Sequence, residues 1–115
     1  MPQTLTVAVC ICNEVTLSDF ITPMEILSGL NLADHPMFAA EMGDVPYRIK
    51  IDYLAPSLQP VVGMVPFMPA IHPTQTYDAA IKSGTQFDIL WIPAGTIIST
   101  YLRDAHADGL NRPLA

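Results

Sequence analysis

The chain has 115 residues, of which half are hydrophobic and 14% are charged, and its formal net charge is −6 at pH 7. This composition excludes a disordered chain and allows one domain at most. Residues 1–47 contain six acids and neither Lys nor Arg, which argues against nucleic acid and against an anionic membrane as partners. The lack of early positive charge disfavours a targeting peptide, and every apolar run is far shorter than the roughly 20 residues that span a bilayer. We therefore expect a cytoplasmic protein.

The first segment of the chain predicts a buried strand followed by a helix. An apolar run rich in β-branched residues extends from Leu5 to Cys12, as in a strand covered on both faces of a parallel sheet. In the next segment Thr22 fits a helix N-cap, Pro23 the first helical residue, and Glu25 a capping-box partner. Asp19 lies between strand and helix, at the carboxyl end of the strand, where open α/β sheets bind ligands.

The remaining segments predict further strands and helices. Five prolines between Pro56 and Pro73 exclude a central strand and favour an edge hairpin, with arms near Val61–Val65 and Phe67–Ile71. The other predicted elements are a helical turn within the long connection at Met37–Met42, an alternating strand at Tyr47–Leu54, a helical turn at Tyr77–Ser83 ending at Gly84, a buried strand at Phe87–Pro93 and a short helix at Thr96–Arg103.

This order of elements predicts an α/β fold: a flavodoxin-like, Rossmann-like parallel sheet with flanking helices and an edge β-hairpin. The strand at Phe87–Pro93 is apolar enough to be central, yet no later segment supplies a strand for its far side. We therefore expect residues 1–103 to be the first half of a larger domain and residues 104–115 to be a frayed tail. Because the uncovered edge should pair with another chain, we expect self-association.

The chain has two cysteines, Cys10 and Cys12, which fall two residues apart on the predicted strand. At that spacing their Cα atoms lie about 6.5–7 Å apart with parallel side-chain directions, a poor geometry for a disulfide. We expect two buried, inert thiols. The three histidines show no ligand spacing, and no Gly-rich phosphate loop follows the first strand, so neither metal nor cofactor is expected.

Three motifs occur in order over most of residues 5–100. Residues 15–27, VTLSDFITPMEIL, resemble V-T-x-x-D-[FL]-x-G-P-x-E-[VI]-L, and residues 76–78, TYD, resemble T-[FY]-x-[DE]. Residues 87–95, FDILWIPAG, resemble D-[IVL]-[LV]-x-[IV]-P-G-G. These are motifs of the ThiJ/PfpI superfamily, which is class I glutamine amidotransferase-like, and the isocyanide hydratase-like branch is the most similar.

The resemblance implies a usually homodimeric domain with a cysteine nucleophile on a strand-to-helix elbow. It implies that Asp19 is the acid paired with that cysteine, and that amides around Gly95 bind developing negative charge. Two positions depart from the pattern: Thr22 and Ala94 stand where the family has glycine, which constricts the pocket or alters its backbone. The elbow, which resembles V-C-T-G and would follow Gly95 by one strand, is missing.

The leading hypothesis is a ThiJ/PfpI-like domain that lacks the cysteine elbow and does not turn over substrate alone. One alternative is a fragment of an active isocyanide hydratase-like enzyme, in which Asp19 activates water for addition to a small electrophile. Another is a flavodoxin-like module that binds a small-molecule ligand. From the residues alone, an acid before a helix, such as Asp19, is more often a helix-dipole or cap partner than a general base. For Gly95 a plain turn and an oxyanion role are equally supported, and Trp91 and the methionines are interpreted as core residues.

Overall fold

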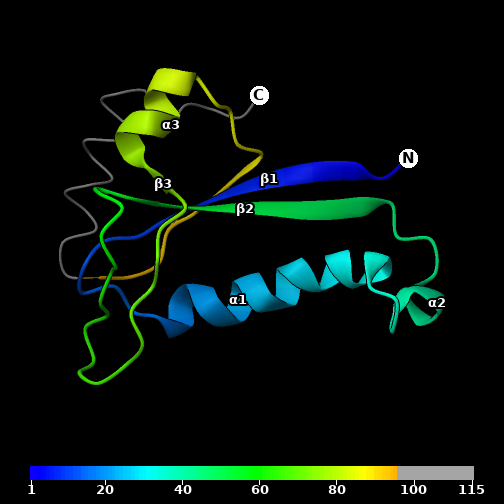
Figure 1. Cartoon of the computed structure of the whole chain (residues 1–115), viewed down its shortest axis with the longest axis horizontal. Coiled ribbons are helices and arrows are strands. Elements are labelled where there is room, and N and C mark those ends of the chain that lie inside the picture. The colour runs from blue at the N-terminus through cyan, green and yellow to red at the C-terminus, as the bar shows by residue number, and fades with distance from the viewer. Residues whose placement is uncertain (96–115) are drawn as a thin grey trace.

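The computed structural model describes residues 1–95, so the predicted helix at Thr96–Arg103 and the predicted tail at residues 104–115 lie outside the described residues. Figure 1 shows the long strands with helices on either side. The elements are β1 (Gln3–Cys10), α1 (Ser18–Ser28), the 3₁₀ helix η1 (Gly29–Asp34), α2 (Ala39–Met42), β2 (Tyr47–Ala55), β3 (Gln75–Thr76), α3 (Tyr77–Ser83) and β4 (Ile89–Trp91).

The four strands form one parallel sheet in the order β3-β2-β1-β4. β1 lies in the interior of this sheet, where Val7 pairs with Ile51 of β2 on one side and with Ile89 of β4 on the other. This arrangement confirms the predicted α/β class with a flavodoxin-like parallel sheet.

Alternating residues of β1 enter two different cores. Val7 and Val9 pack into the cluster that contains Phe20 and Met24 of α1. Ala8 and Cys10 pack into a second cluster with Tyr77, Ala80, Leu54 and Phe87. Side chains of successive strand residues point to opposite faces, so α1 covers one face of the sheet and α3 the other, as Figure 1 also shows. An uninterrupted apolar run is the pattern that such double coverage requires.

The start of the first helix differs from the prediction. α1 begins at Ser18, its N-cap Leu17 makes no side-chain capping bond, and Pro23 lies inside the helix. The capping roles predicted for Thr22 and Glu25 are therefore wrong, and both side chains are exposed within α1. A proline inside a helix removes one backbone donor. Here the Trp91 side chain of β4 donates to the Asp19 carbonyl, which Pro23 leaves without its helical donor.

The predicted edge hairpin is not confirmed as a pair of strands. Between β2 and β3 neither arm forms a strand of the sheet, and one antiparallel bridge joins Val61 to Ile71 through bonds of 2.7 and 2.8 Å. The edge of the sheet on this side is β3, a two-residue parallel strand. The five prolines account for this, because each removes a donor that a ladder would need.

The third helix agrees with the prediction at both ends. Thr76 accepts a hydrogen bond from the Ala79 amide at 3.1 Å as the N-cap, and α3 ends where Gly84 takes a left-handed conformation. The strand predicted at Tyr47–Leu54 and the helical turn predicted near Met37–Met42 are likewise present, as β2 and α2. None of the helices formed by residues 1–95 is long and apolar enough to cross a membrane.

Candidate active site at the carboxyl ends of β1 and β4

Asp19 is the second residue of α1 and lies just beyond the carboxyl end of β1. Its half-buried carboxylate accepts a 3.1 Å hydrogen bond from the backbone amide of Ala94, which follows β4. Asp19 and the Ala94–Gly95 loop therefore lie at the same end of the sheet. Within residues 1–95 the Asp19 Oδ1 atom has no hydrogen-bond partner, so this oxygen is available to a ligand or water.

The strand order explains why these two segments meet. From β1 the chain moves outward to β2 and β3, and it then returns to the opposite side of β1 to form β4. The boundary between β1 and β4 is therefore a topological switch point, where loops leave the carboxyl ends of neighbouring strands in opposite directions. Ligand sites in open α/β sheets occur at such boundaries.

The loop after β1 is held between two other segments. Val15 forms a parallel bridge with Gly63 on one side and an antiparallel bridge with Gly95 on the other. The Met64 amide donates to the Val15 carbonyl at 3.1 Å, and the Thr16 amide donates to the Ala94 carbonyl at 2.9 Å. These bonds fix the backbone that leads into Asp19.

Glycine leaves room for this close approach at both positions. A Cβ atom built on Gly63 would lie 2.9 Å from Cγ of Leu17, and one built on Gly95 would lie 3.2 Å from the Glu14 carbonyl oxygen and from Val15 Cα. Gly95 therefore has a packing reason to be glycine, independent of any oxyanion role.

The residues expected from the resemblance have different surroundings. The Ala94 amide already donates to the Asp19 carboxylate, so it could serve an oxyanion only if the carboxylate moved away. Thr22 lies in the second turn of α1 with its side chain exposed. Asp19, Ala94 and Gly95 are thus brought together, and Thr22 is displaced from them along the helix.

Trp91 is a contact of this site that sequence reasoning missed. Its indole nitrogen donates a 2.8 Å hydrogen bond to the backbone carbonyl of Asp19, while its half-buried ring packs against the α1-side core. The interpretation of Trp91 as a core residue was therefore incomplete. A signal was present, because Pro23 follows Asp19 by four residues and cannot supply the helical donor to that carbonyl.

The two cysteines are free thiols and both are buried, as predicted. Burial raises the pKa of Cys10 to about 11, partly offset by a hydrogen bond from Tyr77. Burial and the neighbouring Glu14 carboxylate raise the pKa of Cys12 as well. Both groups are protonated at neutral pH, which makes them poor nucleophiles.

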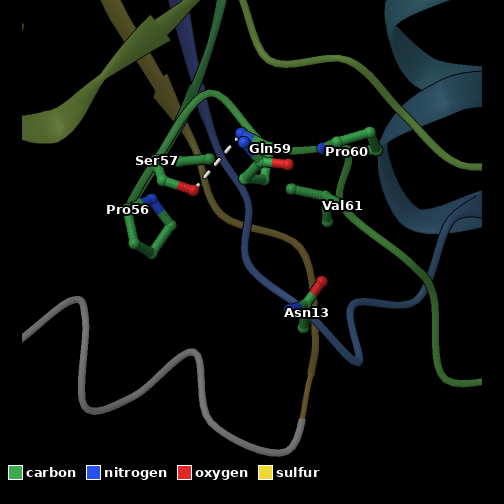
Figure 2. A pocket seen from close by; sticks show the side chains of 7 residues that line it. Asn13, Pro56, Ser57, Gln59, Pro60 and Val61 are labelled. Atoms are coloured by element: carbon green, nitrogen blue, oxygen red, sulfur yellow. Dashed lines mark hydrogen bonds between the residues drawn. The ribbon is translucent and has the colours of Figure 1, made fainter.

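Among the hollows formed by residues 1–95, two lie beside the loops at this end of the sheet. One, of about 110 Å³, is formed by Asn13 and the segment after β2, and Figure 2 shows Ser57 and Gln59 beside it. There the Ser57 hydroxyl accepts from the Gln59 amide at 3.3 Å, and Asn13 Oδ1 accepts from the Val62 amide at 3.0 Å. A larger hollow of about 220 Å³ lies beside the start of α1. In residues 1–95, no group of three or more His, Cys, Asp or Glu side chains is placed to hold a metal ion.

Comparison with known proteins gives a fold relationship. No family model and no curated protein matches the chain. A solved structure from Vibrio parahaemolyticus, described as that of a "putative transcriptional regulator protein", is similar at 16% identity with a TM-score of 0.55. The match covers 93% of this chain and 53% of that one, so the chain spans about half the length of the matched protein. At this identity the likeness establishes a shared fold alone.

Proposed function

We propose that this chain contains the acid of a ThiJ/PfpI-type site, Asp19, but lacks the cysteine nucleophile with which that acid would pair. The observation that carries the proposal is the contact between Asp19 and the Ala94 amide at the β1–β4 switch point. In the motif that the chain resembles, an acid follows the first strand and the P-G-G loop follows the central strand. Asp19 and the Ala94–Gly95 loop occupy these two places.

The chemistry of the proposed site is that of a positioned carboxylate. One oxygen of Asp19 is fixed by the Ala94 amide, and the other accepts no hydrogen bond within residues 1–95. Such a carboxylate can orient a water molecule or take its proton beside a small electrophile. General base catalysis alone contributes about 10²–10⁴-fold, which is too little for the turnover that a covalent cysteine step supports.

The missing component is the nucleophile. Cys10 and Cys12 are the chain's two cysteines, and both are buried with raised pKa values. Cys10 packs among the residues on the α3 face, whereas Asp19 is the second residue of the helix on the α1 face. Neither thiol is suited to attack a substrate held by Asp19, so we propose that the chain alone does not turn over substrates through cysteine chemistry.

A turnover assay on the full 115-residue chain tests this proposal. We expect no isocyanide hydratase, glyoxalase or peptidase rate above buffer, and no change of rate in Asp19→Asn. Cys10→Ser and Cys12→Ser serve as controls for thiol chemistry. Turnover by the unmodified chain that disappears in either serine variant would contradict the proposal.

A second candidate function is a small-ligand-binding module without turnover. It is favoured by the two hollows beside the carboxyl ends of the strands, because open α/β sheets bind ligands at this end. The description of the matched Vibrio protein as a regulator is compatible with a binding role. The two functions differ in what they need: the first depends on Asp19, and the second depends on the lining of a hollow.

A further inference from the structure

The larger hollow lies between the start of α1 and the loop that follows the Val61 bridge. Val15 and Leu17 line it from the α1 side, and Met64, Val65 and Met68 line it from the loop. Val15 and Leu17 are buried, whereas the three loop residues are about half exposed or more, at 49%, 64% and 51%. Val15 has no accessible surface and Leu17 keeps 9% of its own, so the apolar surface that a ligand can contact comes from Leu17 and from the solvent-exposed loop residues, which form the rim.

The loop that forms the rim is unusually apolar for an exposed segment. Val62 and Phe67 are exposed too, at 51% and 106%, and Phe67 has a positive φ of 65°. Exposed apolar side chains that cluster in this way mark interaction sites. Met64 and Met68 suit such a role, because an unbranched thioether side chain adapts its shape to what it contacts.

Polar groups in the hollow are hydroxyls, and none of its lining residues is charged. Thr16 and Ser18 complete the lining, and within residues 1–95 neither hydroxyl has a hydrogen-bond partner. The nearest charges along the chain are acidic, since Glu14 precedes the lining segment 15–18 and Asp19 follows it. An anionic ligand would be repelled by this negative charge. A cationic ligand would lose hydration against the apolar lining, which contains no carboxylate to compensate for the loss.

The size of the hollow limits what it can hold. Its volume is about 220 Å³. An apolar cavity of about 150 Å³ is sufficient for benzene in another protein. A molecule with one ring or a short branched chain, together with one polar group, therefore fits.

From these observations we propose that the hollow binds a small uncharged organic molecule, with an apolar group of about ring size against Leu17, Met64 and Met68. One hydroxyl or carbonyl group of the ligand hydrogen-bonds to Thr16 or Ser18. This inference rests on the second candidate function and not on a chemical role for Asp19. Its failure would leave the proposal on Asp19 and the missing thiol unchanged, because the turnover assay tests that separately.

The probes are cyclohexanol, cyclohexanecarboxylate and cyclohexylamine, titrated into the full chain labelled at its methionine methyl groups with ¹³C. With cyclohexanol, the Met64 and Met68 methyl signals should shift saturably. The signal of Met37 should not shift, although its side chain is 75% exposed, because it lies outside the hollow. The carboxylate should bind at least about tenfold more weakly than the alcohol. Equal or tighter binding of the carboxylate or the amine would overturn the assignment of an uncharged ligand.

Two variants of the same loop distinguish the hollow from general surface adsorption. Val65→Asp places a charge in the lining and should weaken cyclohexanol binding at least about tenfold. Val62→Asp is the matched control, since Val62 is exposed in the same loop but does not line the hollow. Equal weakening in both variants, or none in either, would overturn the proposal. Methyl shifts of Met64 and Met68 that follow protein concentration without any probe would also overturn it, because a second copy of the chain would then cover the hollow.

Discussion

The indole N–H of Trp91 donates a 2.8 Å hydrogen bond to the backbone carbonyl of Asp19, 72 residues away in the chain. In a regular helix this carbonyl would accept from the amide of residue 23, which is a proline and has no N–H group. A side chain of β4 thus replaces the missing helical donor. The bond ties the start of α1 to the strand that carries the Ala94 loop, and Asp19 is held at both its carbonyl and its carboxylate.

A double-mutant cycle tests this replacement. Trp91→Phe should lower the free energy of unfolding by about 1–2 kcal/mol, since it leaves the Asp19 carbonyl without a donor and shrinks the ring. In a Pro23→Ala background the amide of residue 23 supplies the donor, so the same change should cost about 1 kcal/mol less. Urea unfolding of the four proteins gives the coupling. Additive effects, within about 0.5 kcal/mol, would show that Trp91 and Pro23 act independently.

The fold was predictable from the sequence where local pattern and tertiary structure agree. The unbroken apolar run of β1 indicated coverage on both faces, and Gly84 marked the end of α3. The start of α1 was not predictable from local rules. Thr22 and Pro23 have the pattern of a capped helix start, whereas α1 begins at Ser18, and the bonds that hold Asp19 come from Trp91 and Ala94, which are remote in sequence.

Part of the candidate site was predictable for a similar reason. Placement of Asp19 beside Ala94 follows from strand order, which the motifs imply. The hydrogen bond from the Ala94 amide to the Asp19 carboxylate was not predictable. It depends on the tertiary position of one backbone group, which a sequence motif does not specify. The rim of apolar side chains around Met64 and Met68 was also missed, since methionines in a hydrophobic sequence are ordinarily buried.

The two glycines beside Val15 should be intolerant of alanine. Gly63→Ala and Gly95→Ala should each lower the free energy of unfolding by about 1–3 kcal/mol, because the added Cβ meets Leu17 or the backbone of residues 14–15. Gly29→Ala is the control, as its Cβ would meet no atom within 4 Å and its φ of −56° is helical. It should be neutral or stabilise by up to about 1 kcal/mol. Urea unfolding of the three variants measures these free-energy changes. Equal changes at all three positions would refute the packing argument.

Stability at alkaline pH should reveal the buried Cys10 thiol. Its pKa is raised from 9.0 to about 11, so between these values the unfolded chain loses the proton that the folded chain keeps. Stability therefore falls as pH rises from 9 to 11, by on the order of 1–2 kcal/mol from this group. Urea midpoints measured across this range should fall less steeply in Cys10→Ala, where other alkaline groups still titrate. Identical slopes in the two proteins, or rapid labelling of native Cys10 by a thiol reagent at pH 8, would contradict the buried state.

The outer edge of β4 should lead the full chain to self-associate. β4 pairs with β1 along one side, and no strand formed by residues 1–95 pairs with its other side. The Asp88 carboxylate accepts a hydrogen bond from the Thr6 amide of β1 at 2.8 Å. Its charge therefore does not prevent another strand from pairing with the outer side of β4. Ile92, just beyond the strand, is 41% exposed, and an unpaired edge with apolar side chains is a template for another chain.

Sedimentation and light scattering of the full chain should therefore show dimers or larger species that increase with concentration. Ile92→Lys should shift the population toward monomer, since a lysine at a sheet edge must lose hydration when a second strand approaches. Ile26→Lys is the matched control: Ile26 is 74% exposed on α1, on one face of the sheet and away from this edge. A monodisperse monomer with cooperative unfolding would show that the edge is already covered. Equal effects of the two lysines would mean that association uses the α1 face as much as β4.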